Sequence, residues 1–174
     1  PYFWNLSPSY DLTFSPVITS EQGVLGKAQW RHRLASGEYN VDVAGIYQLT
    51  MGSDSAGDSR FRGSARSEGR FEINDNWSWG WDGTLVTDKD FMDKYKIDGR
   101  NEAIDKVYIT GLNDRNYFSA QALHFQSLDS DDEDGTFPTA LPYIQHSYTL
   151  DQPVLGGEFG YDWNLYSIRR NDAV

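Results

Sequence analysis

An acidic segment near residue 130 has the closest spacing of metal-ligating side chains in the sequence. Carboxylates crowd the run Asp129-Ser130-Asp131-Asp132-Glu133-Asp134-Gly135, which resembles a calcium-binding loop. However, Asp134 occupies the position where an EF-hand turn needs glycine, and Ala140 stands where the bidentate glutamate should be. A run of like charges is typical of a solvated loop, so we expect no dedicated metal site here.

The other reactive side chains form no catalytic or metal-binding motif. The three histidines are scattered singly, without the close pairing of a zinc site, at His32, His124 and His146. No G-x-S-x-G, P-loop or paired-cysteine motif occurs, and the chain has no cysteine at all. Carboxylate pairs arise by chance among 26 acidic residues, so a glycosidase has no specific support. We therefore expect no enzymatic activity and no cofactor.

Tryptophans at alternate positions mark the run Trp77-Ser78-Trp79-Gly80-Trp81-Asp82-Gly83-Thr84-Leu85. Successive side chains of a β-strand point to opposite faces, so the run predicts one aromatic face and one polar face. Two environments satisfy this pattern: a β-sandwich with water outside, or a barrel with lipid outside and a watery lumen. In a secreted sandwich, exposed tryptophan rings could instead bind carbohydrate by stacking on sugars.

Composition narrows these possibilities. The 174 residues include 16 glycines and 15% aromatic residues, which suits an all-β protein rich in strands and turns. No run approaches the roughly 18 to 20 apolar residues that a transmembrane helix needs. A net charge of −11 disfavours nucleic acid as a partner, because phosphate binding needs a basic surface. The chain begins abruptly at Pro1-Tyr2-Phe3-Trp4, and we interpret this start as the interior of a longer protein.

Turn signals divide the chain into about nine expected strands with at most a turn or two of helix, around Asp90 to Tyr95. The strand ranges are roughly 9–18, 25–34, 38–50, 61–73, 77–87, 104–112, 116–127, 140–149 and 154–168. Tight turns alternate with longer polar loops near 19–24, 52–60, 88–103 and 128–139. Such alternation places all long loops at one end of the sheet, as in outer-membrane barrels, whereas Greek-key sandwiches mix their connections.

Several segments resemble one known family. The opening Pro1-Tyr2-Phe3-Trp4-Asn5-Leu6-Ser7-Pro8-Ser9-Tyr10-Asp11-Leu12-Thr13-Phe14-Ser15-Pro16 resembles the start of the barrel domain of the lipopolysaccharide-assembly protein LptD family, also called the organic solvent tolerance protein family. Further segments are similar to later parts of that domain: Thr110-Gly111-Leu112-Asn113-Asp114-Arg115-Asn116-Tyr117-Phe118, Leu141-Pro142 and Pro153-Val154-Leu155-Gly156-Gly157.

The resemblance implies that residues 1–174 are part of a large outer-membrane β-barrel of a Gram-negative bacterium, formed by an antiparallel up-and-down meander. The family's periplasmic jellyroll, its disulfide cysteines and its closing strands are missing from this sequence. By resemblance, the function is insertion of lipopolysaccharide (LPS) into the outer leaflet through a lateral gate beside the first strand. The implied partners are LPS, membrane lipids, the lipoprotein LptE inside the barrel, and a periplasmic LPS bridge protein that binds the missing N-terminal domain.

Prolines near the start offer a physical basis for such a gate. Proline cannot donate a ladder hydrogen bond, so Pro1, Pro8 and Pro16 would each weaken the pairing beside them. In the family, prolines matching Pro1 and Pro16 are regarded as kinks that loosen the first strands. We place the gate at these prolines and at Tyr10, Leu12 and Phe14. Alternatively, Pro8 and Pro16 only bound a short strand.

On the barrel interpretation, alternation assigns residues to the two faces. The aromatic side chains expected to face lipid are Trp30, Trp77, Trp79, Trp81, Tyr161 and Trp163, with Val41, Val43 and Phe159 beside them. The polar side chains expected to line the lumen are Asp11, Thr13, Asn40, Asp42, Gln48, Asp82, Glu158, Asp162 and Asn164. A general porin remains a further alternative, since it shares this architecture without a gate.

Overall fold

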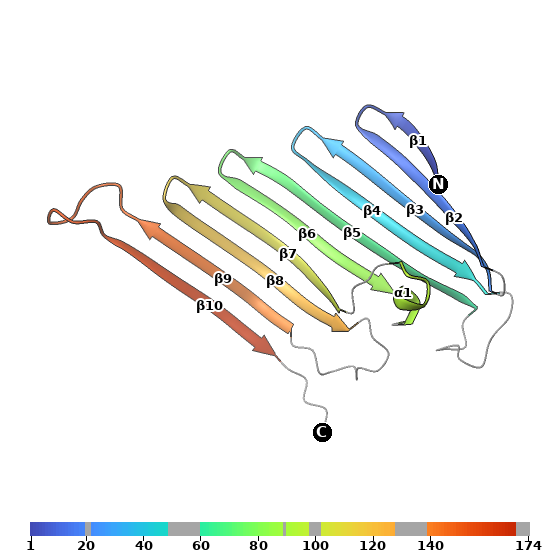
Figure 1. Ribbon diagram of the computed structural model, residues 1–174. Helices are drawn as coiled ribbons and strands as arrows, with labels where there is room; N and C mark the ends of the chain where they lie inside the picture. The colour runs from blue at the N-terminus through green and yellow to red at the C-terminus, as the bar shows by residue number, and fades with distance from the viewer. Residues whose placement is uncertain (20–21, 49–59, 89, 98–101, 128–138, 170–174) are drawn as a thin grey trace, which may run out of the picture.

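The chain forms one antiparallel sheet of ten strands that pair strictly in sequence order (Figure 1). This computed structural model describes residues 1–19, 22–48, 60–88, 90–97, 102–127 and 139–169. The strands are β1 (Tyr2–Ser7), β2 (Tyr10–Thr19), β3 (Gly23–Leu34), β4 (Gly37–Tyr47), β5 (Phe61–Asn74), β6 (Trp77–Val86), β7 (Glu102–Asn113), β8 (Asn116–Ser127), β9 (Thr139–Thr149) and β10 (Gly160–Arg169). The sheet is not closed, and β1 and β10 form its edges. The predicted all-β meander is confirmed and is consistent with part of a larger barrel.

Two strands differ from the prediction. Residues 2–7 precede the first predicted strand range but pair with β2 as β1, so the sheet has ten strands rather than about nine. The last strand begins at Gly160, six residues later than expected, because Val154 and Gly157 pair with each other in a small loop of their own. A local turn at Gly156, whose φ of 83° favours glycine, keeps this segment out of the sheet.

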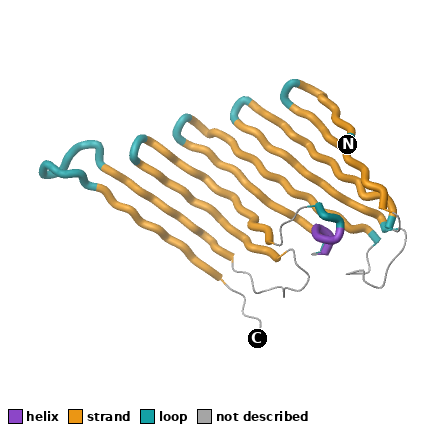
Figure 2. Tube along the Cα trace, viewed as in Figure 1, coloured by secondary structure: helices purple, strands orange, loops and turns teal. Residues whose placement is uncertain are grey.

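Four two-residue turns lie together at one end of the sheet, as Figure 2 shows, while the connection between β2 and β3 at the opposite end, where a longer loop was predicted, spans only three residues. At one end, here called the turn end, two-residue turns join β1 to β2, β3 to β4, β5 to β6 and β7 to β8. Side chains help to close them: Asn74 Oδ1 accepts hydrogen bonds from the N–H groups of Asn76 and Trp77, both at 3.0 Å. The opposite end is called the loop end. The alternation is less strict than predicted, because residues 150–159 make a long connection at the turn end.

A single short helix, α1 (Asp90–Lys94), lies at the loop end in the described part of the chain and matches the predicted helical turn. Phe91 and Met92 are buried against Leu25, Ile46 and Ala44 of the sheet. The face that α1 covers is called the helix face. The opposite face is called the aromatic face. No helix among the described residues is long and apolar enough to cross a membrane.

Candidate functional site

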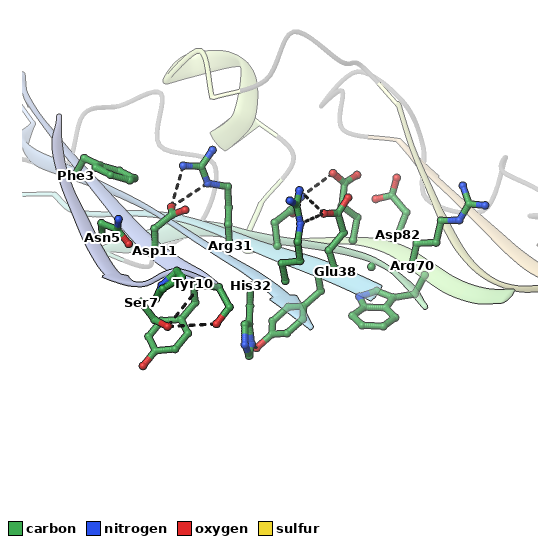
Figure 3. Close-up of a pocket in the computed structure, with 18 of the residues that line it drawn as sticks. Phe3, Asn5, Ser7, Tyr10, Asp11, Arg31, His32, Glu38, Arg70 and Asp82 are labelled. Atoms are coloured by element: carbon green, nitrogen blue, oxygen red, sulfur yellow. Dashed lines mark hydrogen bonds and ion pairs between the residues drawn. The ribbon is translucent and has the colours of Figure 1, made fainter. Parts of the chain in front are cut away.

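Strand alternation separates polar from aromatic side chains across the whole sheet. Residues that pair across strands share a face, so the register fixes each assignment. Asp11 pairs with Arg31, which pairs with Asn40, and all three lie on the helix face. Trp30 pairs with Leu12 and with Val41, and all three lie on the aromatic face. In Figure 3, Asp11 and Arg31 point to one side of the sheet while Tyr10 and His32 point to the other.

The aromatic face carries two neighbouring groups of contacting rings toward the turn end, one on β2 to β6 and one on β6 to β10. Tyr10 stacks on Trp30 with centroids 5.3 Å apart, and Phe71 stacks on Trp81 at 5.7 Å. On the later strands, Trp77 contacts Phe118 at 5.5 Å. We call this set the aromatic belt, and its members are Tyr10, Trp30, His32, Tyr39, Phe71, Trp77, Trp79, Trp81, Phe118, His146, Tyr148, Tyr161 and Trp163.

Glycines opposite tryptophans explain how such large rings lie against the strands. Gly69 pairs with Trp81, and a Cβ atom at Gly69 would collide with the indole. Gly111 pairs with Trp77 in the same way. The polar edge of the Trp81 ring is also satisfied, since its Nε1 donates to Ser67 Oγ at 3.0 Å. Each ring therefore lies against a neighbouring strand, and the belt still leaves Trp79 39% exposed.

The helix face near the turn end carries a network of paired charges. Arg31 contacts Asp11 at 2.9 Å, and Gln29 Nε2 donates to Asp42 Oδ1 at 2.8 Å. Farther along the sheet, Arg66 contacts Glu68 at 2.8 Å and Asp82 at 3.1 Å. Asp11 and Asp42 are directly opposite their partners on the neighbouring strand, Asp82 is diagonal to Arg66 across β5 and β6, and Glu68 lies two residues from Arg66 on the same face of β5.

A cavity of about 640 Å³ opens within this network (Figure 3). Its volume lies in the usual range of about 300 to 1,000 Å³ for ligand pockets. The charged side chains that line it are Asp11, Arg31, Arg33, Glu38, Glu68, Arg70, Asp82 and Lys106. The surface is mainly polar, so it suits a hydrated or polar ligand.

At the loop end, the helix face is dry. Arg62 is 2% exposed and forms a two-pronged ion pair with Asp88, in which Nε donates to Oδ2 at 2.9 Å and Nη2 donates to Oδ1. Gln48 Nε2 donates to the Tyr95 hydroxyl at 3.0 Å, and that hydroxyl donates to Gln22 Oε1 at 2.6 Å. These contacts join the segment around α1 to the sheet.

The sheet contains a seam between β6 and β7 that the sequence did not predict. The ladder between β6 and β7 stops at the pair Asp82–Lys106. Beyond it, the Asp105 carboxylate accepts a hydrogen bond from Thr84 N–H at 2.7 Å, while Gln126 Nε2 donates to Thr84 O at 2.6 Å. Side chains thus replace the backbone ladder where β6 and β7 diverge. No local signal reveals this, since Asp105 and Gln126 belong to ordinary alternating strands.

Most residues predicted for the lumen lie together on the helix face. Asp11, Asp42 and Asp82 belong to the network of paired charges, and Asn40 joins it because its Nδ2 donates to Glu68 Oε1 at 2.8 Å. The register puts Thr13, Asp162 and Asn164 on the same face of the sheet. Gln48 lies just beyond β4 and is buried near α1. Glu158 was predicted to be part of the last strand, but it lies outside β10, is exposed, and contacts Arg115 of a turn at 2.6 Å. Its segment leaves the strand because of the loop around Gly156.

The tryptophans and the tyrosine predicted to face lipid all lie on the aromatic face and in the belt, namely Trp30, Trp77, Trp79, Trp81, Tyr161 and Trp163. Val41 and Val43 share that face. Phe159 lies in the connection before β10 and not in a strand. Among the described residues no second sheet covers the aromatic face, which a β-sandwich would require.

The residues predicted for a gate lie at the β1 edge or one strand behind it. Tyr10, Leu12 and Phe14 are in β2, on the aromatic face, and not at the edge itself. The pairing of β1 with β2 ends at Tyr2–Phe14, next to Pro1 and short of Pro16, and Pro8 is in the turn between the two strands. β1 has six residues and an irregularity between Asn5 and Ser7.

The predicted acidic loop at 129–135 lies outside the described residues. Within the described ranges, no group of three histidine or acidic side chains is placed to hold a metal ion.

Comparisons with known proteins agree on one family. A family model described as LPS transport system D (LptD) matches residues 60–173. The LPS-assembly protein LptD of Shewanella sp. (strain MR-4) is 26% identical over 179 residues, covering 99% of this chain and 22% of the relative. The same-named protein of Hahella chejuensis is 26% identical over 190 residues, covering 100% and 24%. That of Haemophilus influenzae is 29% identical over 153 residues, covering 85% and 19%. The chain thus spans about a fifth of the length of these relatives.

Proposed function

Because the chain belongs to the LptD family, LPS transport system D, we propose that it forms part of an outer-membrane β-barrel wall and takes part in LPS transport and assembly. The observation that carries this proposal is the division of one sheet into an exposed aromatic face and a charged helix face. A barrel wall needs that division, because lipid lies on one side and water on the other.

The aromatic belt indicates how deep in the membrane the sheet would lie. Trp and Tyr rings favour the membrane–water interface, so the belt would lie at the interface near the turn end. Tyr47 and Phe61 pair on the same face near the loop end. Phe61 and Phe71 are ten residues apart in β5, which corresponds to about 26 Å along the bilayer normal at a strand tilt of about 40°. This span suits the apolar band of about 25 Å in outer-membrane barrels.

The β1 edge is the part of the wall that we propose as the lateral gate for LPS. It is the shortest strand described, it pairs irregularly, and prolines flank its pairing with β2. Each backbone hydrogen bond missing from a ladder weakens it by roughly 0.5 to 1.5 kcal/mol. β1 would therefore part from a neighbouring strand more easily than the interior strands part from each other.

The partners follow from the same proposal. LPS would be the cargo, and membrane lipids would cover the aromatic face. A lipoprotein of the LptE kind would lie inside the barrel, on the side of the helix face. A periplasmic LPS bridge protein would bind a domain outside this chain. No reaction chemistry is needed for this role.

Photo-crosslinking in the full-length protein tests the gate. A photo-reactive residue is placed at Trp4 in β1 or at Leu12 in β2, which are paired on the aromatic face. Matched controls at Trp79 and Trp81 lie on the same face, far from the edge. We expect ATP-dependent LPS adducts concentrated at Trp4 and Leu12. Adducts spread evenly over all four positions would reject the gate and leave only a membrane-facing wall.

A further inference from the structure

We propose that the cavity at the turn end of the helix face is a binding subsite for a phosphorylated sugar, formed by Arg70, Tyr108 and Lys106. This inference rests on the proposed function, since it assigns part of the LPS molecule to a particular place on the wall. The inference starts from Arg70 and Lys106, the two cations of the cavity that form no ion pair with the carboxylates of the described residues.

The acidic side chains around the cavity already have partners. Asp11 pairs with Arg31 at 2.9 Å, and Glu38 pairs with Arg33 at 3.2 Å. Glu68 and Asp82 share Arg66, which lies beside the cavity. Three arginines thus face four carboxylates, which leaves one negative charge in this network.

Two cations that line the cavity remain. Among the described residues, Arg70 has no acidic side chain within 4.0 Å, and it is exposed. Lys106 lies over the Tyr108 ring, with 5.7 Å between Nζ and the ring centroid. With Arg66 included, five cations and four carboxylates surround the cavity, and this net charge of +1 within a chain of net charge −11 favours an anionic ligand.

The register places these groups around one small opening. Arg70 pairs with Gly80 of β6, and Gly80 pairs with Tyr108 of β7. Lys106 is on the same face, one row away, opposite Asp82. Arg70 and Lys106 are two strands apart, which is about 10 Å of sheet, so their long side chains can approach one ligand from both sides. A Cβ at Gly80 would collide with the Tyr108 hydroxyl, so the tyrosine ring covers the glycine and forms the floor.

This arrangement suits a sugar phosphate better than a neutral sugar or a lone anion. The guanidinium of Arg70 matches the geometry of phosphate oxygens, and Lys106 adds a point charge. The Tyr108 ring offers a flat apolar surface for the face of a sugar ring. The inner sugars of lipopolysaccharides carry phosphate, so the cargo has the required chemistry.

Binding of two forms of LPS to the full-length protein in detergent tests the subsite. One form is intact, and the other has been treated with phosphatase to remove its sugar phosphates. We expect the Arg70→Gln/Lys106→Gln variant to bind intact LPS about tenfold more weakly than the wild type, and treated LPS equally well. The control variant, Arg31→Gln/Arg33→Gln, removes the same charge from the same cavity at cations that are already paired, and we expect it to change intact-LPS binding less than threefold.

The outcomes separate the subsite from the proposed function. If the wild type binds neither form of LPS, the proposed function fails. If it binds LPS but the Arg70/Lys106 variant is indistinguishable from the control variant, only the subsite is wrong. Inorganic phosphate is titrated as a competitor: displacement of intact LPS at low millimolar phosphate would overturn the sugar-phosphate assignment in favour of a free-phosphate site. Unchanged heat-induced unfolding of both variants excludes misfolding as the cause.

Discussion

The helix face carries an arginine–carboxylate pair at each of its two ends, and the two pairs lie in opposite environments. Arg33 and Glu38, at the turn end, are 79% and 62% exposed. Arg62 and Asp88, at the loop end, are 2% and 16% exposed. The residue types are nearly the same, but water screens the first pair and is excluded from the second.

The difference comes from α1. Phe91 and Met92 bury the apolar positions of β3 and β4 at the loop end, and their neighbours lose water with them. At the turn end nothing in the described part of the chain covers the sheet, so its charges remain partly hydrated around the cavity. One face of one sheet therefore has a dry end, where α1 is packed, and a wet end, where the charges stay hydrated.

The largest expected loss of stability is at the buried Arg62–Asp88 pair. Asp88→Ala removes the carboxylate that the buried Arg62 guanidinium contacts, and breaking such a pair costs about 3 to 5 kcal/mol. We expect α1 to detach from the sheet, which hydrogen exchange of the Phe91 amide in the full-length protein would report as faster exchange.

A double variant sharpens this prediction. Arg62→Met/Asp88→Leu replaces both charges with apolar groups, and such replacements are often neutral or stabilising. Protection of the Phe91 amide should return to near the wild-type level. If the double variant is as unprotected as Asp88→Ala, the pair holds α1 by its specific geometry, and burial alone is not the explanation.

The second largest loss of stability is expected at the apolar contact between Phe91 of α1 and the sheet. Phe91 is fully buried, and Phe91→Ala should destabilise the docked helix by about 3 kcal/mol, at the low end for such truncations because a short helix can shift to fill the space. Limited proteolysis near α1 measures this, with Tyr47→Ala on the exposed aromatic face as the control. Equal cleavage of the two variants would contradict the dry core.

A smaller effect is expected at the hydroxyl that joins α1 to the sheet. Tyr95→Phe keeps the ring but leaves the buried amide of Gln48 without its acceptor, which should cost about 1 to 2 kcal/mol. Chemical denaturation followed by tryptophan fluorescence would measure the loss. Gln48→Leu on the Tyr95→Phe background should recover part of it, because no buried donor is then left unpaired.

The smallest expected change in stability is at the exposed Arg33–Glu38 pair. Glu38→Gln should change the free energy of unfolding by less than about 0.5 kcal/mol, because both partners are mostly exposed. The same denaturation experiment measures it. A loss comparable to that of Asp88→Ala would show that the turn end is buried in the assembled protein and would remove the contrast between the two ends.

Alternation predicted the two faces well, and the reason is geometric. A strand has a period of two residues, so the order Trp77, Trp79, Trp81 is enough to put three rings on one side. Acidic residues at the intervening positions of other strands, such as Asp42, go to the opposite face for the same reason. The predicted strands of the interior accordingly agree with the structure to within a few residues.

Prediction was poorest where pairing partners, rather than local pattern, decide the structure. Tyr2–Ser7 became a strand because β2 offers it a partner, and Glu158 left the predicted last strand because Val154 pairs with Gly157 instead. The seam at Asp105 and the contacts of Arg62 with Asp88 join residues more than 20 positions apart. Predictions from sequence pattern use windows of about 11 to 18 residues, and such a window cannot contain both members of these pairs.

The sequence by itself determined that this protein is a two-faced antiparallel sheet and, through its motifs, the family to which it belongs. The two faces follow from local order, because side-chain direction in a strand depends only on position along the chain, whereas the family follows from segments of similar sequence. Only the tertiary structure decided which charges are buried under α1, which are neutralised in the network, and that Arg70 and Lys106 are left over beside one cavity. Burial and charge pairing depend on what lies across the sheet, and the register of ten strands sets that.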